Sequence, residues 1–79
     1  MNRKIKLIWD FRGPDALEIA KHHHKHLQEY IKSEDLIPKI SGHQPINENY
    51  SIAFMVVEEA NMIPVRDALL PHRAEVYTD

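Results

Sequence analysis

The sequence predicts an α+β domain in which two helices cover one face of a four-stranded antiparallel sheet. Three observations support this prediction. Apolar and polar residues alternate over residues 4–11, an unbroken helical pattern follows over residues 16–32, and residues 50–57 form an apolar run of strand length. The other segments show weaker strand and helix patterns. Taken together, the patterns predict the order strand, helix, strand, strand, helix, strand.

The alternation over residues 4–11 is the strongest strand signal. One face of this strand carries the apolar side chains of Ile5, Leu7, Trp9 and Phe11. The other face carries two lysines, Ile8 and Asp10. A strand with this pattern has one side in the core and one side that is mainly polar.

The long helix begins just after Gly13. Pro14 suits a first helical position, and Asp15 complements the positive end of the helix dipole. Asp15 with Glu18 also fits a capping box, which moves the start by two residues. The predicted inner face contains Ala16, Ala20, His23, His24, Leu27, Tyr30 and Ile31.

The second half of the chain supplies three more predicted elements and a turn. Residues 39–46 form a weak strand that contains Gly42 and Pro45, so we expect a bulged strand at an edge of the sheet. A turn over residues 47–49 leads to the apolar strand 50–57, which belongs in the middle of the sheet.

The last two elements are a short helix and a short strand. Asn61 is a suitable N-cap for a helix over residues 62–70, and Pro71 ends that helix. Residues 73–77 then form a polar strand suited to the other edge.

This element order resembles the ferredoxin-like βαββαβ fold, and the resemblance covers a single domain of residues 1–79. Two groups with related folds carry motifs that this chain lacks. It has no cysteine, so the Cys-x-x-Cys of heavy-metal chaperones is missing. Arg12 and Gly13 supply only one arginine and one glycine of the loop typical of acylphosphatases.

Composition limits the possible function classes. The absence of cysteine excludes disulfides and thiolate metal sites. A net charge of −2 argues against a general nucleic-acid-binding protein, which needs a basic face. The apolar run near the N-terminus is too short for a signal peptide or a membrane span, so we expect a cytoplasmic protein without membrane or nucleic-acid partners.

The predicted topology brings the end of the first strand close to the start of the last one. We expect an anion site there, at the N-terminus of the long helix, formed by Arg12, Gly13, His72 and Arg73. The expected ligand is a small carboxylate or phosphate. In the alternative interpretation the two arginines pair with Asp10 and Asp15 and only hold the loops together.

The helix contains four of the six histidines. His22 and His26 are four residues apart on the outer face and Glu29 follows, so these three side chains are the candidate ligands of a divalent transition metal. A solvated face without metal is the alternative. His23 and His24 flank the apolar stripe, where we expect them to be partly buried and to need hydrogen-bond partners.

The uncovered face of the sheet predicts self-association. Ile8 must point to that face, together with either Ala53, Met55 and Val57 or Ile52, Phe54 and Val56. Exposed apolar surface on a sheet is typical of an interface, and a chain of 79 residues gains stability from a second copy. We therefore expect a homodimer through this open sheet face.

Three functional hypotheses follow. The first is a ligand- or partner-binding domain, homodimeric and without catalysis of its own. The second is a metal-binding protein that uses the histidine-rich helix. The third is a small dimeric enzyme of the α/β-barrel type, with acid–base residues in a cleft between helix and sheet.

Overall fold

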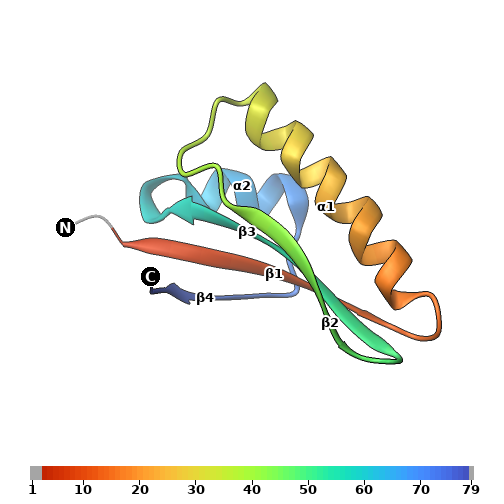
Figure 1. Cartoon of the computed structure of the whole chain (residues 1–79). Helices are drawn as coiled ribbons and strands as arrows, with labels where there is room; N and C mark the ends of the chain where they lie inside the picture. The colour runs from red at the N-terminus through yellow and green to blue at the C-terminus, as the bar shows by residue number, and fades with distance from the viewer. Residues whose placement is uncertain (1–2, 79) are drawn as a thin grey trace.

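The computed structural model describes residues 3–78 and has the predicted order of elements (Figure 1). The elements are β1 (Lys4–Arg12), α1 (Ala16–Ser33), β2 (Ser41–Asn47), β3 (Tyr50–Glu58), a 3₁₀ turn η1 (Glu59–Asn61), α2 (Met62–Leu69) and β4 (Arg73–Tyr77). Both helices lie on the same side of the sheet. The fold is ferredoxin-like, as predicted.

The sheet is antiparallel throughout, with the strand order β2-β3-β1-β4. The central pair β1 and β3 is in register over nine residues, from Lys4 opposite Glu58 to Arg12 opposite Tyr50. Strand β4 pairs with β1 only as far as Ile8. The last part of β1 therefore has no strand on its β4 side.

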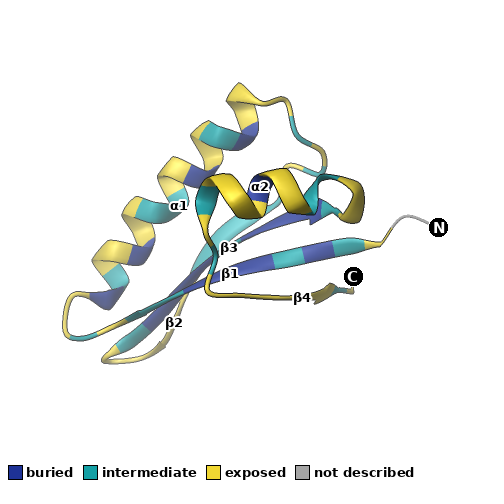
Figure 2. Cartoon of the chain, turned by 180° about the vertical axis from the view of Figure 1, so that it is seen from behind, coloured by how far each residue is buried: buried dark blue, intermediate teal, exposed yellow. Residues whose placement is uncertain are grey.

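The core lies between the helices and the inner face of the sheet. Helix α1 buries one stripe of its surface, as Figure 2 shows by the buried segments along it. The buried core cluster contains Ile5, Leu7, Trp9, Leu27, Ile31, Ala53, Met55, Val57 and Val65. The apolar faces predicted for the first strand and the long helix are thus confirmed.

The helix caps differ from the sequence prediction. Asp15 and Asn61 occupy the N-cap positions, but neither side chain makes a capping hydrogen bond. Leu70, in place of the usual glycine, ends α2 in the left-handed conformation with φ of 50°. The expected irregularity of β2 is confirmed, since its register shifts between Pro45 and Asn47.

Trp9 connects β1 to the end of α2. Its ring is 3% exposed, and its Nε1–H donates a hydrogen bond of 3.0 Å to the carbonyl of Leu69. Carbonyl groups in the last turn of a helix have no partner within that helix. The indole therefore satisfies a helix end and fills the core at the same place.

We expect Trp9→Phe to lower the free energy of unfolding by about 2–3 kcal/mol, because it leaves the Leu69 carbonyl without its partner and creates a small cavity. Urea denaturation followed by circular dichroism measures this change. The exposed substitution Ile63→Val is the control and should stay within about 0.5 kcal/mol of the native chain. Equal stability of both variants would contradict the role assigned to Trp9.

Candidate functional site

Four histidines lie at one level across the inner face of the sheet. His43 of β2 is opposite Ala53 of β3, and Ala53 is opposite Trp9 of β1. His72 precedes β4 and continues the same level, because the next residue pairs with Ile8. His23 and His24 of α1 reach down to either side of Ala53. We call His23, His24, His43 and His72 the histidine row.

His24 and His43 join α1 to the edge strand β2. Their Nδ1 atoms are 2.9 Å apart, so one ring must carry its proton on Nδ1 and donate it to the other. His24 Nε2 is buried and has no hydrogen-bond partner among residues 3–78. Burial lowers the pKa of His24, and the neighbouring His43 lowers it further.

His23 packs on the aromatic side chains of β1. Its ring centroid is 4.8 Å from that of Trp9 and 5.5 Å from that of Phe11. Its Nε2 atom is also buried, without a hydrogen-bond partner in the described part of the chain. Burial is the main cause that lowers the pKa of His23, and repulsion from His26 and His72 adds to it. The predicted partial burial of His23 and His24 is confirmed.

His72 takes the place of a strand beside the end of β1. Its backbone N–H donates to the carbonyl of Ile8, and its Nδ1 accepts a hydrogen bond of 2.8 Å from the backbone N–H of Asp10. The neutral ring therefore carries its proton on Nε2. This side chain satisfies a strand edge that β4 does not reach.

A groove lies between α1 and the start of β2, one helical turn beyond the pair His24–His43. Its volume is about 350 Å³, and it is lined by Gln28, Ile31, Lys32, Lys39 and Ser41. Ile31 is buried, whereas the other lining residues are polar or charged. This volume is in the range of small-molecule sites.

The charge in this groove has one sign. Lys32 and Lys39 contribute two ammonium groups, and the lining residues among 3–78 include no carboxylate. In the described part of the chain, neither lysine has a carboxylate oxygen within 4 Å. The groove thus offers positive charge together with the hydrogen-bonding side chains of Gln28 and Ser41.

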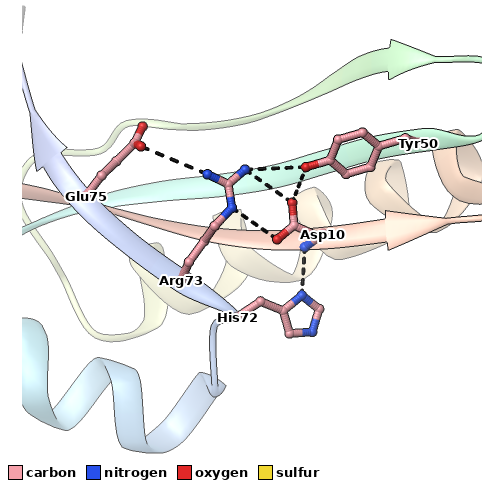
Figure 3. A network of polar contacts seen from close by, with 5 residues as sticks. All are labelled: Asp10, Tyr50, His72, Arg73 and Glu75. Carbon is pink, nitrogen blue, oxygen red and sulfur yellow. Dashed lines mark hydrogen bonds and ion pairs between the residues drawn. The ribbon is translucent and has the colours of Figure 1, made fainter.

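A polar network occupies the opposite, open face of the sheet (Figure 3). Arg73 donates to both carboxylate oxygens of Asp10, with Nε–Oδ2 and Nη2–Oδ1 distances of 3.1 and 3.2 Å. The hydroxyl of Tyr50 donates to Asp10 as well, and Glu75 lies 4.0 Å from the same guanidinium. Hydrogen bonds from Arg73 are the main cause that lowers the pKa of Asp10, against the effect of burial, and Tyr50 contributes further.

Three of the four residues of the predicted anion site are divided between the two faces of the sheet, and the fourth, Gly13, lies in the loop before α1. Arg12 stacks on the ring of Tyr50 at 4.1 Å, and Arg73 contacts the hydroxyl of that same residue, both on the open face. His72 lies near Phe11 on the inner face. Gly13 has φ of 115° and donates its N–H to the carbonyl of Asn49.

In the alternative interpretation, both arginines pair with carboxylates of their own chain. This describes Arg73 but not Arg12. Arg73 is paired with a carboxylate of its own chain, whereas Arg12 is held by an aromatic ring. Gly13 connects the loop before α1 to the turn between β2 and β3.

The predicted metal ligands lie on the outer face of α1. His22, His26 and Glu29 are exposed, and His26 Nδ1 is 3.8 Å from Glu29 Oε2. Among residues 3–78, no three histidine, aspartate or glutamate side chains are grouped closely enough to hold a metal ion. Metal binding at this face stays a prediction.

The open face carries Ile8, Ile52, Phe54 and Val56, the second of the two predicted sets. Three of these side chains are buried within one chain, with exposed fractions of 2% for Ile8, 5% for Ile52 and 0% for Val56. The Phe54 ring lies over Gly42, where an added Cβ would come 2.7 Å from it, and Lys6 covers the ring at 4.4 Å. The homodimer stays a prediction, and three of the four apolar side chains on this face are already buried within one chain.

The sequence analysis did not predict the groove or its polar lining residues, although two patterns indicate them. His24, Gln28 and Lys32 recur every four residues along α1, and Lys39, Ser41 and His43 alternate along the chain that enters β2. Both patterns place their members on one face of an element. What the sequence does not state is that these two faces lie against each other.

The histidine row predicts a loss of stability in mild acid. His23 and His24 have pKa values below the ordinary 6.5 in the folded chain, so the unfolded chain binds more protons. Their contribution is complete above about pH 6.5 and is lost as the pH falls through the folded values. We expect the free energy of unfolding to fall between pH 7 and 5, by at most about 1.4 kcal/mol per pH unit for each histidine.

Denaturant titrations at several pH values, with the variant His23→Leu, test this dependence. The variant should show a smaller slope with pH, since it removes one of the two buried imidazoles. The exposed substitution His22→Leu is the matched control and should leave the slope unchanged. A His23→Leu curve parallel to that of the native chain would contradict the assignment.

No helix in the described residues is long and apolar enough to cross a membrane. Comparison with models of known families, with curated proteins and with solved structures gives no match.

Proposed function

We propose that this protein is a small-molecule-binding domain whose ligand is an anion held in the groove between α1 and β2. The observation that carries the proposal is the pair Lys32 and Lys39, which line a groove that has no carboxylate among its described lining residues. The proposal includes no reaction. The proposed ligand belongs to the class predicted from the sequence, a small carboxylate or phosphate. Its proposed site is the groove between α1 and β2 and not the N-terminus of the long helix.

The arrangement of the groove supports an anion in three ways. Two ammonium groups attract negative charge, and the neighbouring amide of Gln28 and hydroxyl of Ser41 can donate hydrogen bonds. The buried side chain of Ile31 forms an apolar wall that excludes water from one side. Because these ammonium groups have no carboxylate partner in the described residues, binding a ligand does not break an ion pair.

The arginines on the open face are less suited to the same ligand. An anion at Arg73 must compete with Asp10, which already accepts two hydrogen bonds from that guanidinium. An anion at Arg12 must displace the ring of Tyr50 or bind beside it. Both changes cost interactions that the folded chain already makes.

Phosphate or acetate added to the native chain should shift the backbone amide signals of Gln28, Ile31, Lys32, Lys39 and Ser41 in NMR spectra. The double variant Lys32→Gln/Lys39→Gln should weaken binding by at least about tenfold, because it removes both charges. The matched control Lys21→Gln/Lys25→Gln changes the net charge by the same amount on the outer side of α1 and should bind normally.

Two outcomes would contradict the proposal. Shifts centred on Arg12, Gly13 and Arg73 would return the ligand to the site predicted from the sequence. Equal weakening by both double variants would mean that only the overall charge of the chain matters.

A further inference from the structure

Strand β4 forms an edge of the sheet that has no further neighbour among residues 3–78. It pairs with β1 on one side only, and four of its five residues are exposed. Figure 2 shows β4 as an exposed ribbon at the margin of the sheet. The outward N–H and C=O groups of such a strand are available to pair with another strand.

The two edges of the sheet are protected to different degrees. Strand β2 contains Pro45 and a register shift after it, and both features interrupt pairing with an additional strand. Strand β4 contains no proline, and its register with β1 is regular. The residues of β4 that face the inner side, Ala74 and Val76, are uncharged. Strand β4 is therefore the edge that is open to pairing.

A groove of about 230 Å³ lies along the inner side of β4, next to the start of α2. Its apolar lining consists of Ile5, Met62, Ala74 and Val76. Arg3 and Glu59, which also line it, form an ion pair with each other. Val76 is 52% exposed, although Ile5, its register partner on β1, is buried. A strand added beside β4 would cover this apolar surface.

The open-face side of β4 carries one cation and one anion. Arg73 and Glu75 are two residues apart and share this face (Figure 3). Arg73 uses Nε and Nη2 to bind Asp10, whereas its Nη1 is 4.0 Å from Glu75, too far for a hydrogen bond. Lys6 is opposite Glu75 on β1 but lies over the ring of Phe54. Both Glu75 and Nη1 of Arg73 therefore have capacity for a closer partner.

This charge pattern is complementary to itself. When two copies of β4 pair antiparallel about a twofold axis at Ala74, Arg73 of each copy lies opposite Glu75 of the other, which gives two cross-strand ion pairs. An axis at Glu75 would place two carboxylates opposite each other, which is unfavourable. An axis at Val76 would place Glu75 opposite Tyr77 and form no ion pair. Charge thus favours the axis at Ala74.

The pairing about Ala74 extends over residues 72–76. His72 already runs alongside β1, since its N–H donates to the carbonyl of Ile8. In this register, the partner's His72 lies opposite Val76, and the partner's Leu70 is two residues further along. Leu70 is 72% exposed, so each copy brings an exposed apolar residue close to the exposed Val76 of the other.

We infer that this chain forms a homodimer in which two copies of β4 pair antiparallel about Ala74 and join the two sheets into one of eight strands. This interface differs from the open sheet face predicted from the sequence. The anion groove lies at β2, on the other edge of the sheet, so the inference is independent of the proposed function.

Sedimentation equilibrium of the native chain between about 10 µM and 1 mM should show a reversible dimer, since a short strand pair gives a small interface and weak association. NMR spectra over the same range should shift the backbone amide signals of residues 72–77 and leave those of Ile46 and Phe54 unchanged. A monomer at every concentration would overturn the inference, as would shifts centred on Phe54. These two measurements need no variant.

Val76→Lys places a charge on the inner side of the edge and should weaken the dimer at least about tenfold. Val76 is half-exposed, so the variant should keep its fold, which circular dichroism verifies. Ile46→Lys introduces a lysine at a similarly exposed position of β2 and should dimerise normally. Native association of Val76→Lys, or loss of the dimer in Ile46→Lys alone, would overturn the assignment to β4.

Glu75→Gln tests the register. This variant removes both cross-strand ion pairs and should weaken the dimer by about fivefold. Glu48→Gln makes the same change in the turn between β2 and β3 and should leave the dimer unchanged. Stronger association of Glu75→Gln would mean that the two Glu75 side chains face each other, and it would overturn the pairing about Ala74.

Discussion

The contact of α1 with the sheet at Ala53 determines how the rest of the inner face is arranged. Ala53 is fully buried and has the smallest side chain at its level, between His43 and Trp9. The helix can approach closely there, and its two neighbouring histidines extend to opposite sides, one onto Trp9 and one to His43. A larger residue at position 53 would lift the helix and separate both contacts.

The two faces of the sheet satisfy their polar groups in different ways. On the open face, Asp10 receives hydrogen bonds from Arg73 and Tyr50, and cations cover the rings of Tyr50 and Phe54. There, Arg73 is paired with a carboxylate of its own chain, whereas Lys6 and Arg12 lie on aromatic rings. On the inner face, and among the residues that the structure describes, the buried Nε2 atoms of His23 and His24 have no hydrogen-bond partner, and the nearby groove has positive charge without a lining carboxylate. Unbalanced groups of this kind are where a ligand can contribute most.

The periodicity of the apolar residues and the local composition were sufficient to predict the helices and strands, because each of these elements depends on local chemistry. The alternation of residues 4–11 and the apolar run 50–57 identified the two central strands, and the helical stripe identified the buried residues of α1. The caps were less predictable. Asp15 and Asn61 lie at the expected positions, but their side chains make no capping bond, since a cap depends on the path of the preceding loop.

The sequence by itself determined the fold class, the order of elements, the inner and outer faces of α1 and the partial burial of His23 and His24. Tertiary structure alone decided which of the candidate groups meet. The register of β4 stops at Ile8, so Arg73 reaches Asp10 while His72 turns to the other face. Similarly, His24, Gln28 and Lys32 share one face of α1, but this spacing indicates a site only because that face lies beside β2. Periodicity fixes the face of one element, whereas contact between two faces depends on the packing of the whole core.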